Sequence, residues 1–359
     1  MSASLLGADA PEVEDQPRGP AWVDVDLAAI RHNVRTMLTA GPPGAKLLAV
    51  VKADAYGHGA TQVSRAALDA GAFGLAVARV REGVALRDAD ITAPVLVLGY
   101  TSVRELADVL ANDLAITISD MQTAQALSAL AMAAGRKGRV HVKVDTGMHR
   151  FGIMPEDAVE VAARVATLPG VWLEGIYTHY ATADEEDSPV YAQQGARFAE
   201  VVHALELRGL RPSLVHAANS AAAMSGREPP WDAVRAGIAL YGVQPTQARM
   251  LSLLPAMSLK AEVGRVLDVH EGEGVSYGQH YRAATTIAAA VVPCGYADGY
   301  MRSLGGTGEV LLGGRRCRVL GAVCMDSLVV GLPGDLEIAV GAEAVLLGSQ
   351  GAERVSAEE

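Results

Sequence analysis

The sequence lacks most of the features that mark specialised classes of protein. It has only three cysteines, Cys294, Cys317 and Cys324, and no C-x-x-C pair, which excludes a disulfide framework and a zinc knuckle. No apolar run approaches the ~20 residues that a membrane-spanning helix needs. No basic stripe favours nucleic acid, since 30 basic residues stand against 41 acidic ones for a net charge of −11. We therefore predict a cytoplasmic protein that binds neither a membrane nor nucleic acid.

The N-terminus also lacks a targeting signal. Residues 1–20 are acidic and rich in proline and glycine, without the basic start and apolar stretch of a signal peptide, so we interpret them as a flexible tail. The chain as a whole is 50% hydrophobic and only 20% charged. That is enough apolar surface for a folded core and excludes a wholly disordered protein.

Residues 21–250 alternate between short apolar, β-branched runs and amphipathic helical stretches. Eight strand-like runs begin at Lys46, Phe73, Pro94, Leu114, Val140, Leu173, Ser213 and Val234. Strands that are hydrophobic almost throughout and alternate with helices indicate a parallel sheet buried on both faces. We predict a (β/α)8 TIM-type barrel, because no G-x-G-x-x-G or Walker sequence supports the open doubly wound sheet.

Residues 251–359 have a different pattern. Short β runs are separated by glycine-rich turns, and helical periodicity is nearly absent. This pattern predicts a C-terminal all-β domain that follows the α/β barrel. The strand-like segment at residues 22–25, which precedes the barrel, is a candidate partner for that β domain.

Polar residues follow the predicted barrel strands, at the end where a barrel builds its active site. Lys52 follows the first strand, where it either extends from the rim into water or, held away from water, attacks carbonyl groups. Asn219 and Ser220 follow the seventh strand, and Arg235 with residues 237–238 belongs to the eighth. The loops after strands seven and eight commonly bind phosphate. An amine, a phosphate cradle and an arginine together suit pyridoxal 5′-phosphate.

Eight segments carry a family resemblance: AVVKADAYGHGA, HVKVDTGMHRFG, GIYTHYATAD, HAANSAA, RAGIALYG, VSYGQHY, GYADGY and VCMDS. In this order and spacing the chain resembles the bacterial pyridoxal-phosphate-dependent alanine racemases. The first segment with VSYG and CMD is the most specific part, since related amino-acid decarboxylases share only fragments. The resemblance implies a head-to-tail homodimer that interconverts L- and D-alanine and supplies D-alanine for cell-wall peptidoglycan.

The resemblance also implies roles for individual residues. Lys52 carries the cofactor and is one proton base, while Tyr277, reaching in from the partner subunit, is the second. A relay from Tyr277 through His179 to Arg235 is implied, with Arg235 facing the pyridine nitrogen. The other cofactor-binding residues are Tyr56, Asn219, Ser220, Gly237 and Ile238. The remaining site residues are Arg150 and Met325 for the substrate carboxylate, Tyr296 at the entrance, and Lys143, which many members carry as a carbamate. No metal is implied.

Two departures from the family pattern stand out. His149 takes a place where glycine is usual; a non-glycine residue is tolerated there if φ is negative, and its imidazole would crowd Arg150. The chain ends at GAERVSAEE, where family members continue through a helix and a last β segment with a tyrosine that contacts the phosphate. If that end is lost, we expect effects on cofactor affinity and on the dimer contact.

Three alternatives remain beside an alanine racemase. A racemase of broader specificity, for serine, lysine or arginine, is the nearest, although a mouth lined by Tyr277 and Tyr296 favours a small side chain. A non-catalytic pyridoxal-phosphate-binding protein is the second, but such proteins are usually a bare barrel. A related decarboxylase is the third, and its usual cysteine-bearing specificity helix is not recognisable here.

Overall fold

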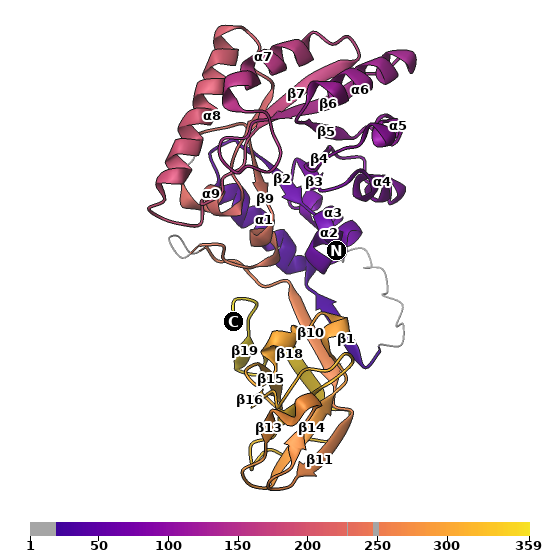
Figure 1. Cartoon of the computed structure of the whole chain (residues 1–359), viewed down its shortest axis with the longest axis vertical. Coiled ribbons are helices and arrows are strands. Elements are labelled where there is room, and N and C mark those ends of the chain that lie inside the picture. Colours follow the sequence, from indigo (N-terminus) through magenta and orange to yellow (C-terminus); the bar gives the residue numbers. More distant parts are fainter. Residues whose placement is uncertain (1–18, 228, 247–250) are drawn as a thin grey trace, which may run out of the picture. The chain divides into compact units, whose positions relative to one another are not determined.

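The computed structural model describes residues 19–227, 229–246 and 251–359, so most of the predicted N-terminal tail lies outside the described residues. The chain divides into two compact units. Val25–Ala256 forms the first, called the barrel unit below, and Met257–Glu359 with residues 19–24 forms the second, called the β unit. In Figure 1 the colours run from indigo to orange through the barrel unit and from orange to yellow through most of the β unit.

A closed barrel of eight parallel strands forms the first unit and confirms the predicted fold class. The strands follow one another around the barrel in chain order: β2 (Lys46–Val50), β3 (Gly74–Val77), β4 (Val95–Val97), β5 (Ala115–Ile118), β6 (Gly138–Lys143), β7 (Val171–Tyr177), β8 (Leu214–His216) and β9 (Ala233–Ala236). All eight lie within or beside the predicted runs. The last run was predicted to stay extended through residue 242, which is wrong, because the chain leaves β9 at Gly237 and forms the 3-10 turn η2 (Ile238–Tyr241).

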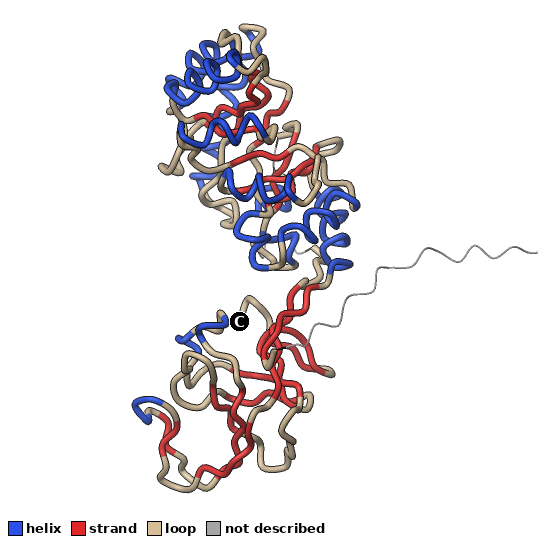
Figure 2. The backbone as a smooth tube through the Cα atoms, turned by 90° about the vertical axis from the view of Figure 1, so that its right-hand side faces the viewer, coloured by secondary structure: helices blue, strands red, loops and turns tan. Residues whose placement is uncertain are grey.

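Helices connect these strands, as Figure 2 shows in blue. They are α1 (Leu27–Ala40), α3 (Ala60–Asp69), α4 (Val80–Asp88), η1 (Val103–Glu105), α5 (Leu106–Ala111), α6 (Met121–Ala133), α7 (Pro155–Ala166), α8 (Pro189–Leu207) and α9 (Ser220–Ser225). Asp120 caps α6, because its carboxylate accepts the Thr123 N–H at 2.7 Å. Pro155 and Pro189 begin α7 and α8 at the first turn, where no intrahelical N–H donor is needed.

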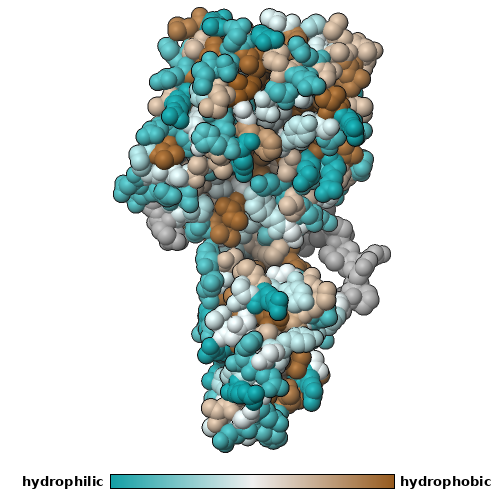
Figure 3. All heavy atoms as spheres, in the orientation of Figure 1, coloured by the Kyte–Doolittle hydropathy of each residue, from teal (hydrophilic) through white to brown (hydrophobic). Residues whose placement is uncertain are grey.

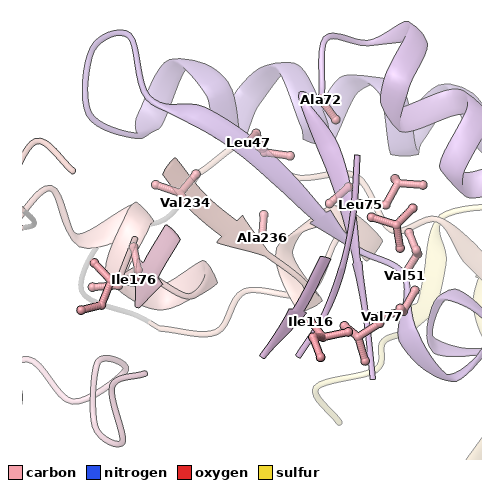
Figure 4. Close-up of a cluster of buried hydrophobic side chains, with 14 of the residues drawn as sticks. Leu47, Val51, Ala72, Leu75, Val77, Ile116, Ile176, Val234 and Ala236 are labelled. Atoms are coloured by element: carbon pink, nitrogen blue, oxygen red, sulfur yellow. The ribbon is translucent and has the colours of Figure 1, made fainter. Parts of the chain in front are cut away.

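The barrel is held by apolar side chains on strands that are buried almost throughout. Figure 4 shows Leu47, Leu75, Ile116, Ile176 and Val234 in one cluster, contributed by five different strands. Each is at most 3% exposed. Burying a side chain of this size contributes about 1.5–3 kcal/mol. The walls are therefore rigid, and the polar groups at the strand ends are carried on a fixed frame.

The β unit consists of antiparallel sheets. One has the order β1 (Ala21–Val25), β10 (Met257–Glu262), β18 (Glu343–Gln350), β15 (Glu309–Leu312) and β16 (Arg315–Arg318), with β19 (Glu353–Val355) beside β18. The others are β11 (Arg265–Val269), β14 (Ile287–Val292) and β17 (Leu328–Gly331), and the pair β12 (Gly274–Val275) and β13 (Tyr281–Arg282). Short 3-10 turns are η3 (Tyr277–Gln279), η4 (Tyr296–Asp298) and η5 (Arg302–Leu304). The first strand of the chain thus pairs with the β unit.

Figure 3 shows one face, where hydrophilic side chains are interspersed with small apolar patches. Among the described residues, every helix is too short or too polar to cross a bilayer. On the β unit, large side chains that remain exposed include Tyr277, Met301 and Met325.

Candidate active site

A cavity of about 450 Å³ opens among residues that follow the barrel strands at their carboxyl ends. The structure brings together here the site residues predicted in the barrel: Lys52, Tyr56, Lys143, Arg150, His179, Asn219, Ser220, Arg235, Gly237 and Ile238. Each of these residues lies near the end of one of five strands or in the segment that follows it. A barrel collects the carboxyl ends of its strands at one face, which is why residues almost 190 positions apart in sequence line one cavity.

Lys52 begins a turn of unusual handedness, assigned as α2 (Lys52–Gly57). From Ala53 to Tyr56 each φ lies between 52° and 56°, which is the left-handed region. This conformation costs about 1–2 kcal/mol for each non-glycine residue, so the surroundings must impose it. Glu82 accepts the Ala53 N–H at 2.8 Å, and Asp54 accepts the Ala60 N–H at 2.6 Å. The turn lets Lys52 and Tyr56 line the same cavity.

Ser220 and Gly237 form a polar corner of the cavity. The Ser220 hydroxyl oxygen accepts the backbone N–H of Gly237 at 2.9 Å and of Ala239 at 3.4 Å, which leaves its own proton to donate elsewhere. A β-carbon on Gly237 would lie 2.7 Å from the Tyr56 hydroxyl oxygen. Burial raises the pKa of Tyr56, so its phenol keeps a proton to donate. Asn219 caps α9 through the Ala222 N–H at 2.9 Å.

Arg235 is buried and bonded on several sides. Its Nη2 donates to the carbonyl oxygens of Thr178 and Ala217, each at 2.8 Å, and lies 3.2 Å from His179 Nδ1. Its Nη1 lies 2.6 Å from His216 Nδ1. A guanidinium only donates, so His216 must present an unprotonated Nδ1, while the two protons of Nη2 are directed at the two carbonyl oxygens. Burial and then the charge of Arg235 lower the pKa of His179 to about 3. The permanent cation of the predicted relay is therefore Arg235, with a neutral His179 beside it.

Lys143, which ends β6, shares the cavity with two arginines. Burial, followed by the charges of Arg235 and Arg150, lowers the pKa of Lys143 to about 8. Its Nζ lies 5.6 Å from the ring centroid of Tyr177, a buried cavity residue that our sequence reasoning missed. The register pairs Lys143 with Tyr177 across β6 and β7, so strand pairing was the signal that could have found it.

Asp145 organises the loop that precedes the predicted carboxylate-binding arginine. Its carboxylate accepts four backbone N–H groups, from Gly147, Met148, His149 and Arg150, at 2.9–3.2 Å. Burial alone would raise the pKa of Asp145, but these four bonds outweigh it and lower the pKa, so an ionised carboxylate closes the loop. The φ of His149 is 53°, so the negative φ under which a non-glycine residue is readily tolerated is not adopted there. The tight loop closed by Asp145 requires this left-handed position.

The three remaining predicted site residues belong to the β unit and lie beside one another. The Tyr296 N–H donates to the Cys324 carbonyl at 3.1 Å, next to Met325 in the chain. The Ser276 hydroxyl donates to the Ala322 carbonyl at 2.6 Å, and a φ of 62° at Ser276 precedes Tyr277, which is 75% exposed. We call Tyr277, Tyr296 and Met325 the tyrosine face.

The cavity offers an amine, a phenol, a hydroxyl, backbone N–H groups and a guanidinium. Among the described residues, no group of three or more histidine, cysteine, aspartate or glutamate side chains is arranged to hold a metal ion. The cavity residues are thus suited to an anionic ligand, and the lysine to a carbonyl on it.

Comparison with known proteins gives one family over almost the whole described chain. Residues 25–245 match the family described as alanine racemase, N-terminal domain, and residues 256–359 match alanine racemase, C-terminal domain. An alanine racemase of Symbiobacterium thermophilum is 44% identical over 344 residues, which is 95% of this chain and 90% of that protein.

Solved structures agree with the sequence matches. Alanine racemase of Clostridium difficile 630 superposes with a TM-score of 0.90 at 36% identity, covering 96% of this chain and 90% of that one. Alanine racemase from Bacillus anthracis with bound L-Ala-P gives 0.87 at 38% identity, covering 94% and 88%. With both domains matched and the barrel cavity built from the family's motif residues, the chain belongs to the alanine racemase family of pyridoxal-phosphate-dependent isomerases.

Proposed function

We propose that this chain interconverts L- and D-alanine with pyridoxal phosphate held in the barrel cavity, using two proton bases on opposite faces of the substrate. The observation that carries the proposal is the convergence of Lys52, the Ser220–Gly237 corner and Arg235 in one cavity. Each group alone has an ordinary structural explanation, such as a lysine extending from the rim. Their convergence is what a phosphate-bearing aldehyde with a ring nitrogen needs.

The residues present fit this cofactor. Lys52 supplies the amine that holds the aldehyde carbon. The Tyr56 phenol, the Ser220 hydroxyl and the backbone N–H of Ile238 supply donors for the phosphate, while the Gly237 N–H is donated to Ser220. Asn219, beside Ser220, supports this corner by capping α9. Gly237 also fits a phosphate site, since any side chain at this position would fill the space beside the Tyr56 hydroxyl. When bound, pyridoxal phosphate supplies an electron sink that makes the α-hydrogen of an amino acid acidic.

Arg235 sets the character of that sink. A guanidinium cannot practically give up a proton, so a ring nitrogen facing Arg235 stays unprotonated. A bound cofactor would then withdraw electrons from the substrate less strongly, which would favour return of the proton to Cα over its transfer to atoms of the cofactor. We infer that Arg235 favours racemisation over transamination.

Racemisation requires proton removal from one face of Cα and proton return on the other. Lys52 Nζ serves one face from within the cavity. The Tyr277 phenol serves the other, and its 75% exposure on the tyrosine face makes it available to a second copy of the chain. We therefore propose a homodimer in which each copy lends Tyr277, with Tyr296 at the entrance, to its partner.

Arg150 and the backbone at Met325 are proposed to bind the substrate carboxylate. Lys143 supports Arg150 as a carbamate: its neutral amine attacks CO₂, forms an N–C bond and loses a proton. A pKa of about 8 makes the neutral amine accessible. The resulting anion offsets the charges of Arg150 and Arg235, which lie close enough to lower that pKa.

Alanine is the proposed substrate because of the family and the tyrosines proposed at the entrance, and peptidoglycan supply is the proposed role. The test has two arms on full-length protein with added cofactor. Borohydride reduction followed by peptide mass mapping should find the cofactor on Lys52. Incubation of L-alanine in deuterated water should give both enantiomers with deuterium at Cα, and serine, lysine and arginine should react more slowly. A protein that binds the cofactor at Lys52 yet exchanges nothing is a carrier, and the proposal is then wrong.

A further inference from the structure

A chain of buried polar side chains runs through the inside of the barrel and ends at Arg235. Arg235 Nη1 lies 2.6 Å from His216 Nδ1, and His216 Nε2 lies 2.9 Å from His141 Nδ1. His141 Nε2 lies 3.4 Å from Glu174 Oε2. Arg139 donates to the same carboxylate through Nε at 3.0 Å and Nη2 at 2.7 Å. Arg139 lies near the start of β6 and Arg235 near the end of β9, so this series of side chains runs along the length of the barrel.

The two ends fix the direction of every hydrogen bond between them. Arg235 can only donate, so His216 accepts at Nδ1 and carries its proton on Nε2. That proton is donated to His141 Nδ1, so His141 also carries its proton on Nε2. An ionised Glu174 can only accept, and it receives that last proton. Both imidazoles are thus neutral and both are of the Nε2–H tautomer.

Burial agrees with this assignment. Glu174, His141, His216 and Arg235 are each at most 4% exposed. Burial lowers the pKa of both histidines, which keeps them neutral. Burial alone raises the pKa of Glu174, but hydrogen bonds from His141 and Arg139 reverse this and keep the carboxylate ionised.

Two local features of β7 make room for these hydrogen-bonded side chains. A β-carbon on Gly175 would lie 2.2 Å from His141 Nδ1, so only glycine fits opposite that ring. The register between β6 and β7 shifts at this point, from Val140 opposite Leu173 to His141 opposite Gly175. Glu174 is the extra residue, and such a bulge redirects a side chain. The backbone is therefore shaped to bring Glu174 to His141.

We propose that Glu174 is a positioning residue for Arg235, because it fixes the tautomers of His141 and His216 so that a lone pair faces the guanidinium. Without an acceptor at position 174, the His141–His216 pair can reverse, and His216 then points an N–H at Arg235. Arg235 must move or lose that bond. The inference rests on the proposed function only for the role of Arg235 toward the cofactor ring.

The test compares three variants of the full-length protein. The double variant Arg139→Leu with Glu174→Leu removes the terminal ion pair without leaving a lone buried charge. Glu174→Gln removes the charge but keeps an oxygen that can accept from His141. Thr117→Val is the matched control, because Thr117 is a buried hydroxyl of the barrel interior, bonded to Tyr177 at 2.7 Å, outside the histidine chain.

The primary readout is the tautomer of each buried histidine, from ¹⁵N spectra of histidine-labelled protein with and without pyridoxal phosphate. The spectrum of His216→Asn lacks the His216 resonances and so identifies them in the wild-type spectrum. We expect only the Nε2–H form in the wild type, in Thr117→Val and in Glu174→Gln, and a population of Nδ1–H in the double variant. Cofactor affinity should fall about tenfold in the double variant, as expected for one lost buried hydrogen bond.

An unchanged tautomer in the double variant, or a cofactor affinity equal to that of Thr117→Val, overturns the inference. The two proposals fail separately. If the wild type neither binds the cofactor nor racemises alanine, the proposed function fails, while the tautomers of the cofactor-free protein still decide the role of Glu174.

Discussion

The Tyr56 hydroxyl oxygen lies 2.7 Å from the point where a β-carbon on Gly237 would stand. Tyr56 arrives there from the left-handed turn after β2, and Gly237 from the end of β9. The Tyr56 ring is also held from one side, with its centroid 4.7 Å from that of Tyr241. The Tyr56 hydroxyl can therefore occupy this position at the proposed phosphate site only because residue 237 has no side chain.

The first prediction tests this dependence. Gly237→Ala should displace the Tyr56 hydroxyl and weaken pyridoxal-phosphate binding by about 1–3 kcal/mol, roughly 5- to 150-fold. In a Tyr56→Phe background the hydroxyl is already absent, so the same alanine should cost clearly less. Spectroscopic titration of the four proteins measures this coupling. Strictly additive effects would show that the two residues act independently.

A second prediction concerns the left-handed residue before the proposed carboxylate-binding arginine. His149 has a φ of 53°, so His149→Gly should relieve backbone strain and stabilise the barrel unit by about 0.5–1 kcal/mol after the entropy cost of glycine. His149→Ala is the control, since it removes the imidazole but keeps the β-carbon. Urea denaturation compares the three proteins. An equal gain from alanine would trace the effect to the imidazole instead.

The third prediction follows from the pKa of Lys143. With a pKa of about 8, roughly half of this amine is neutral at about pH 8, against ~0.3% for an ordinary lysine. Protein equilibrated with ¹³C-bicarbonate should show one carbamate carbon resonance that weakens as the pH is lowered. Lys143→Arg should lack it. A resonance that persists in Lys143→Arg, or none at any pH, contradicts the assignment.

The fourth prediction is a pH dependence of stability. The pKa of His179 is about 3 in the folded chain against 6.5 for an ordinary histidine, so the unfolded chain binds more protons between these values. Stability must then fall as the pH falls from about 6.5 toward 3, by up to ~1.4 kcal/mol per pH unit for this one group. His179→Gln should show a shallower decline below pH ~6.5 in denaturation measurements. Parallel curves for both proteins would contradict the buried neutral imidazole.

Much of the barrel could be predicted from the sequence, because each strand is a local apolar run and each helix has local signals such as Asp120. The order of strands also predicts which residues meet. Lys52 follows β2 and Arg235 lies near the end of β9, and these two strands are neighbours in the closed sheet. Both predictions depend on periodicity, which a single sequence displays directly.

Other features could not be predicted, because they oppose local preferences or depend on distant contacts. Nothing in Ala53 to Tyr56 favours a left-handed turn, and Glu82, far along the chain, helps to impose it. The contact between Glu174 and His141 arises where the register of β6 and β7 shifts, which local sequence does not display. The φ of His149 could not be predicted either, because the four bonds to Asp145 shape the loop.

The central claim is that an amine of one copy and a phenol of another act together at one site. Its most direct test is to co-express Lys52→Ala and Tyr277→Phe, each under a separate tag, and to purify the mixed dimer pool. Each variant alone should be inactive. The purified mixed dimers should recover about half of the wild-type racemase activity, because each has one complete site out of two. A mixture that stays inactive, or Tyr277→Phe protein that racemises alanine at the wild-type rate, would contradict the account.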